Sequence, residues 1–306
     1  MSLSCDPVSE SDGAGAEPVF LLAPARSYST VAVAMLSGHP DVYGFPETLV
    51  FTAATVGELI GERAEWARFP LRLSGLWRAV ADLHEGGQDD DAVARARTWL
   101  ADRAEWSTKR LMDHLIDLVR PRVSLEKSPD TSSDDAMLAR CMTAYPRARF
   151  LHLVRHPVTN QRSLHDHWRP AGRFRSEQAL VAEAAAFWYR SHQRIIEALA
   201  PLPPEQWMRV RAEDLLTEPR VWLPRILSWL RLDSEPRLVE RMLLTEHWRF
   251  AGTGRSDDLL GGDPKFLRSP ALRPVPAPGP VVFDPSWGLD DEICDRMTTL
   301  AHSLGY

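Results

Sequence analysis

The segment "VFLLAPARSYSTVAVAMLSGHPDVYGFPE" (Val19–Glu47) decides the fold of this chain. It opens with a short apolar run, which is typical of a parallel strand buried on both faces. A helix is expected over about Thr30–Gly38, and the turn before it contains Arg26 and several hydroxyls. Because a helix N-terminus offers unpaired N–H groups and partial positive charge, this junction predicts a phosphate or sulfate site. A capped helix with a surface arginine is the alternative.

Strands and helices alternate along the rest of the chain. "ARFLHLVRHP" (Ala148–Pro157) predicts a second buried strand, and shorter strands are expected in "RVSLEKSP" (Arg122–Pro129) and "WMRVRAEDL" (Trp207–Leu215). Gln178–Leu199 predicts a long amphipathic helix, and Ala251–Pro285, rich in Gly, Pro and charge, an extended covering loop. No repeat or long linker divides the chain. We therefore expect a single α/β domain with a central parallel sheet flanked by helices.

The composition narrows the classes of function. With 306 residues and a formal net charge of −6, the chain is not expected to have nucleic acid as its main partner, so any anion site must be local. Three widely spaced cysteines without a CxxC pair predict neither a disulfide framework nor a zinc site, and they fit a reducing cytoplasm. No apolar run approaches the roughly 20 residues of a membrane span. Residues 1–16 are acidic and polar, and we expect a disordered leader there.

The common nucleotide-binding fingerprints are missing. The sequence contains no GxxxxGK[ST], so an ordinary ATP- or GTP-binding loop is not supported. It also contains no GxGxxG, which argues against a dinucleotide-binding fold. The predicted anion site therefore belongs to a different kind of enzyme or binding protein.

Four segments, in order, carry a resemblance to a known family: "LLAPARSYSTVAVAMLSGHPDVYGFPE", "LEKSPD" (Leu125–Asp130), "RFLHLVRHPVTNQRSL" (Arg149–Leu164) and "RVRAEDLLTEP" (Arg209–Pro219). The chain resembles sulfotransferases that use 3′-phosphoadenosine-5′-phosphosulfate (PAPS), and most nearly bacterial small-molecule and polyketide-synthase sulfotransferase domains. The resemblance implies a P-loop-like sulfotransferase domain over residues 17–306. It also implies a cytoplasmic enzyme of specialised metabolism that moves a sulfonate group from PAPS, without a metal, to a hydroxyl of a small-molecule or carrier-protein-bound acceptor.

The resemblance assigns the donor site residue by residue. Around the 5′-phosphosulfate it implies Arg26, Ser27, Tyr28, Ser29 and Thr30, with Arg26 stabilising charge as the S–O bond breaks. For the 3′-phosphate it implies Arg155 and Ser163. Helix capping by the hydroxyls, and a strand-end arginine paired with an acid, remain the alternatives.

Several residues are candidates for the acceptor side of the site. The family resemblance favours Glu47 as general base, although a structural acid is equally consistent with the residue. Lys127 is expected to touch the transferring sulfonate or the acceptor, with a surface lysine as the alternative. His152, His156, His165 and His167 are minor base candidates. "HDH" (His165–His167) is rejected as a metal site because the two rings face different directions on a helix.

One residue departs from the family pattern. Tyr28 stands where the resemblance leads one to expect glycine, and tyrosine tolerates a left-handed backbone poorly. Two rivals to an active sulfotransferase stay open, and Tyr28 motivates the first of them. One is a sulfotransferase-like nucleotide-binding protein that has lost turnover; the other, less supported, is a P-loop kinase.

Overall fold

The computed structural model describes residues 17–61, 71–172, 174–253 and 260–306. Its centre is a parallel sheet with the strand order β2-β3-β1-β4-β5. The strands are β1 (Val19–Leu22), β2 (Val42–Gly44), β3 (Val123–Glu126), β4 (Arg149–Val154) and β5 (Trp207–Arg211). The prediction of an α/β fold with a central parallel sheet is confirmed.

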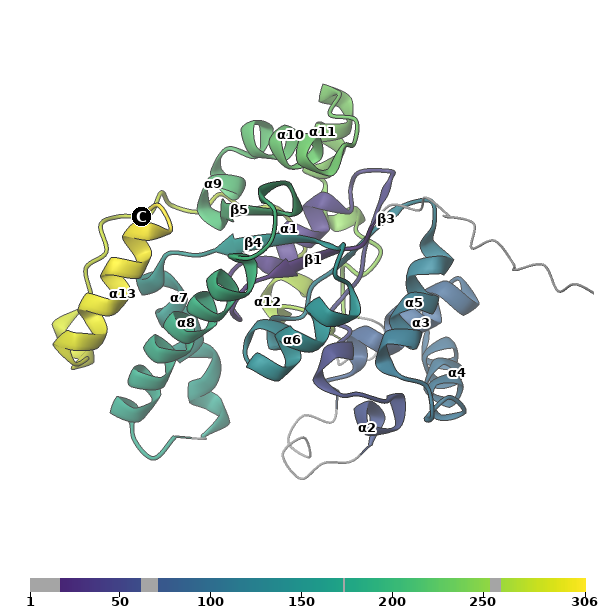
Figure 1. Ribbon diagram of the computed structural model, residues 1–306, viewed down its shortest axis with the longest axis horizontal. Coiled ribbons are helices and arrows are strands. Elements are labelled where there is room, and N and C mark those ends of the chain that lie inside the picture. Colours follow the sequence, from purple (N-terminus) through teal and green to yellow (C-terminus); the bar gives the residue numbers. More distant parts are fainter. Residues whose placement is uncertain (1–16, 62–70, 173, 254–259) are drawn as a thin grey trace, which may run out of the picture.

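Helices cover both faces of this sheet. Figure 1 shows α9, α10 and α11 on one side, and α6 and α8 on the other. The helices are α1 (Ser29–Leu36), α2 (Val56–Ile60), α3 (Ser74–Glu85), α4 (Asp90–Ala101), α5 (Thr108–Val119), α6 (Asp135–Ala144), α7 (Pro157–Trp168), α8 (Glu177–Leu199), α9 (Ala212–Thr217), α10 (Pro219–Leu230), α11 (Pro236–Met242), α12 (Pro264–Leu267) and α13 (Asp291–Ser303).

Some elements differ from the sequence-based expectation. Apolar residues recur at helical spacing from Asp91 to Val119, a pattern that by itself predicts helix throughout, but a turn at residues 102–107 divides this stretch into α4 and α5. Strand β2 was not predicted, because its three residues stand in a segment that reads only as a helix end. The leader expected at residues 1–16 and residues 62–70 lie outside the described residues.

The buried strands explain where the site forms. All four residues of β1 are buried, and Val19 pairs with Leu125 of β3 on one side and Arg149 of β4 on the other. The carboxyl ends of β1, β3 and β4 therefore meet at one edge of the sheet. In open α/β sheets this edge, where neighbouring strands lead to different sides, is the usual place for a ligand.

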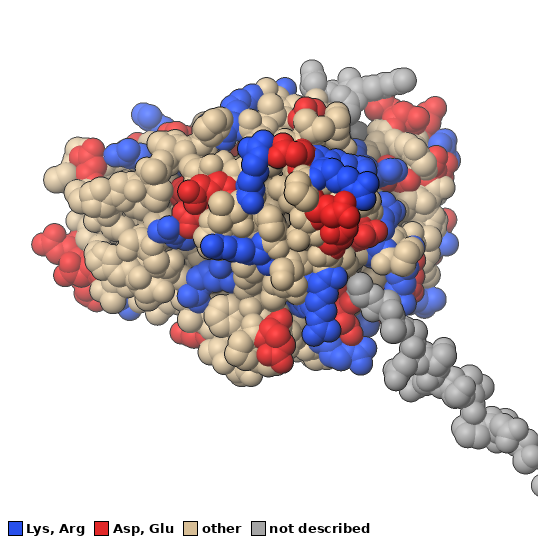
Figure 2. Space-filling view, turned by 90° about the horizontal axis from the view of Figure 1, so that it is seen from above, with Lys and Arg blue, Asp and Glu red and all other residues tan. Residues whose placement is uncertain are grey.

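The described surface carries no broad cationic face in the view shown. Figure 2 shows Lys and Arg interspersed with Asp and Glu on this side of the molecule. Among the described residues, no helix is both long and apolar enough to cross a membrane.

Candidate active site

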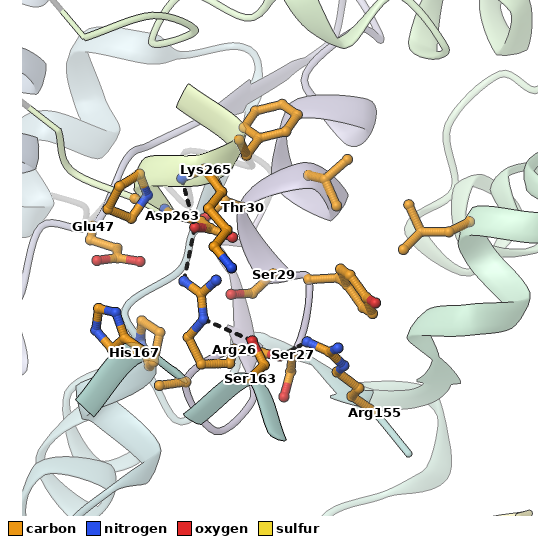
Figure 3. Close-up of a pocket in the computed structure, with 18 of the residues that line it drawn as sticks. Arg26, Ser27, Ser29, Thr30, Glu47, Arg155, Ser163, His167, Asp263 and Lys265 are labelled. Carbon is orange, nitrogen blue, oxygen red and sulfur yellow. Dashed lines mark hydrogen bonds and ion pairs between the residues drawn. The ribbon is translucent and has the colours of Figure 1, made fainter. Parts of the chain in front are cut away.

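A cavity of about 510 Å³ opens at the carboxyl edge of the sheet. The turn after β1, the residues after β3, helix α7 and a late segment around α12 contribute to its walls. Figure 3 shows Glu47 and His167 on one side of Arg26 and Arg155 on the opposite side. Eight of the nine residues predicted for the site line this cavity: Arg26, Ser27, Tyr28, Ser29, Thr30, Glu47, Arg155 and Ser163.

The turn after β1 has an unusual backbone. Arg26 and Tyr28 both have positive φ angles, 66° and 61°, in the left-handed region that non-glycine residues rarely adopt. Asn160 of α7 stabilises the turn, because its Nδ2 donates to the Ala25 carbonyl at 3.0 Å and to the Ser27 hydroxyl at 3.1 Å. The hydroxyl-bearing turn is thus fixed against α7 before any ligand binds.

The guanidinium of Arg26 is paired within the protein. Its Nη1 lies 2.8 Å from Oδ1 of Asp263, and its Nε donates to the hydroxyl of Ser163 at 3.2 Å. The backbone N–H of Asp263 donates in turn to Thr30 Oγ1 at 2.9 Å. The late segment is therefore attached to both ends of the turn, and Ser163, predicted to act with Arg155, contacts Arg26 instead.

Lys127 lies behind the cavity. Its side chain is 1% exposed, and its Nζ lies 2.5 Å from Glu47 Oε1 and donates to Thr30 Oγ1 at 2.9 Å. The alternative of a surface lysine is wrong. Lys127 is the predicted site residue that does not line the cavity; its ammonium contacts Glu47 and Thr30, which do line it.

Glu47 is held by its backbone as well as by Lys127. Its N–H donates to the Gly261 carbonyl at 2.8 Å. The next residue, Thr48, donates its hydroxyl to Glu126 at 2.7 Å, and Ser128 donates to the same carboxylate at 2.5 Å. Burial raises the pKa of Glu126, while these hydrogen bonds lower it. Glu126 is thus a structural group that ties the end of β3 to the segment carrying Glu47.

Arg155 is fixed without a carboxylate. Its Nη1 donates to the Arg26 carbonyl at 2.6 Å, its Nε donates to Thr159 Oγ1 at 3.1 Å, and its guanidinium carbon lies 4.0 Å from the centre of the Tyr28 ring. Burial holds the pKa of Arg155 below its usual value. No ion pair of Arg155 with an acid occurs in the described part of the chain, so that alternative is wrong there.

Sequence reasoning missed several lining residues. Asp130 and Asp263 stand in recognisable segments but received no role, and Leu216 and Arg273 gave no signal. Of the four histidines named as minor base candidates, His167 lines the cavity and the other three do not. Desolvation in the cavity wall and the nearby charge of Glu47 raise the pKa of Asp130 to about 6. The residues that the structure describes contain no group of three or more His, Cys, Asp and Glu placed to hold a metal ion.

Comparisons with known proteins identify the family and the fold. A family model described as "Sulfotransferase family" matches residues 18–236. The structure is similar to a sulfotransferase domain from the curacin biosynthetic pathway, with a TM-score of 0.74, 23% identity, and coverage of 93% of this chain and 97% of that one. It is also similar to a sulfotransferase domain from the Synechococcus PCC 7002 olefin synthase, with a TM-score of 0.70, 25% identity, and coverage of 93% and 94%. A search of curated proteins gave no match. Since the family model spans most of the chain, the protein belongs to the sulfotransferase family.

Proposed function

We propose that the protein transfers a sulfonate group from PAPS to a hydroxyl of a small-molecule or carrier-protein-bound acceptor in bacterial specialised metabolism. One observation carries the proposal: Arg26 and Arg155 line the same cavity from opposite sides of a hydroxyl-rich turn. A donor with phosphate groups at both ends of a ribose requires two separate cations. Guanidinium groups suit this role because they bind phosphate in a planar, two-pronged geometry.

The donor occupies the cavity along the turn. Arg26, the hydroxyls of Ser27, Ser29 and Thr30, and the N-terminus of α1 receive the 5′-phosphosulfate. Arg155 receives the 3′-phosphate. Ser163, now bonded to Arg26, stands beside the 5′ side in this arrangement.

The reaction is an in-line displacement at sulfur. The acceptor oxygen forms a new S–O bond while the bond to the bridging phosphate oxygen breaks, and the electron pair leaves with adenosine 3′,5′-bisphosphate. Glu47 takes the hydroxyl proton. Arg26 stabilises the negative charge on the leaving oxygen, and Lys127 remains a charged neighbour of the neutralised Glu47 carboxyl.

Neighbouring proteins inform the acceptor class. The two similar domains come from a biosynthetic pathway and from an olefin synthase, which supports an acceptor made by an assembly-line or related pathway. Cys141 and Cys294 are both free, which is consistent with the cytoplasm.

The cavity also bears on the rival hypothesis, a nucleotide-binding protein that has lost turnover. Tyr28 adopts the left-handed conformation expected of glycine, and the cavity beside it stays open at about 510 Å³. The open cavity weighs against a closed donor site. Turnover, which separates the enzyme from the nucleotide-binding rival, is measured by sulfonate transfer from labelled PAPS. The sequence lacks the GxxxxGK[ST] motif, whose lysine binds nucleoside triphosphates, and two arginines line the cavity instead. Both observations weigh against a kinase.

The test begins with the nucleotide. Adenosine 3′,5′-bisphosphate should raise the melting temperature of the protein, whereas ADP, which lacks the 3′-phosphate, should do so far less. Transfer from labelled PAPS is then followed with a panel of free alcohols and carrier-bound hydroxyacyl chains. Equal shifts of the melting temperature with both nucleotides, or no shift at millimolar concentration, would refute the proposal before the acceptor screen begins.

A further inference from the structure

Tyr28 occupies a costly backbone position. Its φ and ψ are 61° and 16°, so it lies in the left-handed region, where a bulky side chain is strained and glycine is not. It is the N-cap of α1, yet its side chain makes no capping hydrogen bond. Because the residue makes no capping hydrogen bond, its role lies in the contacts of its side chain. It packs against the hydrophobic core, and it makes one further contact inside the cavity that it lines.

That contact is with Arg155. The guanidinium carbon lies 4.0 Å from the ring centre, within the range of a cation–π interaction. Arg155 is 9% exposed and has lost most of its hydration, which holds its pKa below the usual value. Such desolvated pairs are the stronger ones, because the ring face replaces water around the cation.

The other contacts of Arg155 leave donors for a ligand. Its Nε is used by Thr159 and its Nη1 by the Arg26 carbonyl, and Trp188 Nε1 donates to the Arg155 carbonyl at 2.9 Å. Its Nη2 has no hydrogen-bond partner within the described part of the chain. A guanidinium has five N–H donors in one plane, so the plane is fixed while some donors remain available to the cavity that Arg155 lines.

We propose that Tyr28 is a positioning residue that holds the Arg155 guanidinium ready for the second phosphate of the nucleotide, and that it thereby sets the preference for a 3′,5′-bisphosphate over a 5′-monophosphate. This inference rests on the proposed function. In this inference Tyr28 favours nucleotide binding despite its strained backbone. Replacing it by glycine should relieve the strain and still weaken bisphosphate binding.

The experiment measures dissociation constants of adenosine 3′,5′-bisphosphate and adenosine 5′-monophosphate by calorimetry for four proteins. They are the wild type, Tyr28→Phe, Tyr28→Asn and Tyr28→Gly. Phenylalanine keeps the ring and removes a hydroxyl that has no hydrogen-bond partner in the described residues. Asparagine and glycine both tolerate the left-handed backbone but lack the ring.

The expected pattern is specific to the second phosphate. Tyr28→Asn and Tyr28→Gly lose about 3- to 30-fold in bisphosphate affinity, while monophosphate affinity changes by less than about 3-fold. Tyr28→Phe keeps the wild-type ratio of the two constants. In an Arg155→Met background, Tyr28→Gly causes no additional loss, because the two residues act as one unit.

Other results would overturn the inference. Unchanged or tighter bisphosphate binding by Tyr28→Gly would show that the ring does not position Arg155. An equal loss for both nucleotides would mean that the variants distort the turn as a whole. A wild type that binds the two nucleotides equally would refute the proposed function itself, which is distinguishable from both results.

Discussion

The two arginines of the cavity are held in opposite ways. Arg26 is neutralised by the protein, since Asp263 lies 2.8 Å from its guanidinium. Arg155 is held by a carbonyl, a hydroxyl and an aromatic ring, none of which carries charge. An anion that arrives at Arg26 must displace a carboxylate, whereas one that arrives at Arg155 meets an oriented cation. We therefore call the Arg26 side of the cavity the exchangeable end, because a ligand there replaces Asp263, and the Arg155 side the preorganised end.

The largest expected effect is at the exchangeable end. Arg26→Ala should lower kcat/KM by about 10²- to 10³-fold, because it removes a donor that stabilises charge in the transition state. Sulfonate transfer from labelled PAPS measures it. Arg268→Ala, an exposed arginine of the same late region, is the matched control and should stay within about 2-fold of wild type. A less than tenfold loss for Arg26→Ala would remove this residue from the chemistry.

Near the exchangeable end, the backbones of Gly75, Glu47 and Gly261 pack closely together. A Cβ added at Gly75 of α3 would lie 2.1 Å from the Glu47 carbonyl oxygen and 3.0 Å from the Cα of Gly261. Gly75→Ala should therefore destabilise the fold by about 1–3 kcal/mol, which denaturant unfolding measures. Gly87→Ala, where an added Cβ meets nothing within 4 Å, is the control. Equal stability of the two variants would contradict the close approach.

A smaller effect tests displacement of the internal carboxylate. Asp263→Asn leaves an acceptor for the Lys265 N–H but removes the charge beside Arg26, so bisphosphate affinity should rise by about 3- to 10-fold. Titration calorimetry compares it with Asp284→Asn, which changes an exposed cap elsewhere. Weaker binding by Asp263→Asn would instead make Asp263 a group that orients Arg26 for the donor.

The smallest effect concerns the second carboxylate of the cavity. Desolvation in the cavity wall and the charge of Glu47 raise the pKa of Asp130 from 3.8 to about 6, so between these values the folded state binds more protons than the unfolded state. Stability then falls as the pH rises through this window, and the full penalty is present above it. Asp130→Asn removes the penalty and should raise the melting temperature at pH 7.5 by about 1–3 °C. The shift is modest because the residue is exposed by its surface area, so solvent screens much of the penalty.

The same variant should lose its advantage in acid. Near pH 4, the wild type and Asp130→Asn should melt together, and thermal scans from pH 4 to 8 follow the convergence. Asp284 is the control, because hydrogen bonds from Ser286 hold its pKa below the usual value. Asp284→Asn should give no stabilisation at pH 7.5. A pH-independent gain for Asp130→Asn would contradict the raised pKa.

The fold was predictable where one pattern dominates. Strands β1 and β4 are continuous apolar runs, and α8 is a long amphipathic repeat, so local periodicity suffices. Strand β2 has three residues, and it exists because it pairs with β3, a contact that no local pattern reveals.

The candidate site was predictable in its residues but not in its pairings. Short motifs located Arg26, Glu47 and Arg155, which all line the cavity. The bond from Arg26 to Asp263 spans 237 positions and depends on the path of the late segment, which composition did not fix. The burial of Lys127 follows from its place directly after a central strand of the sheet, so topology rather than motif decides its partners.

The direction of β1 places Glu17 and the cavity at opposite edges of the sheet. The cavity lies beyond its carboxyl end, whereas the chain enters at its amino end, where Arg147 and Glu17 form an ion pair at 2.8 Å. Four residues of strand separate the two edges by about 13 Å. The ion pair that fixes the first described residue therefore lies at the edge of the sheet opposite to the mouth of the cavity.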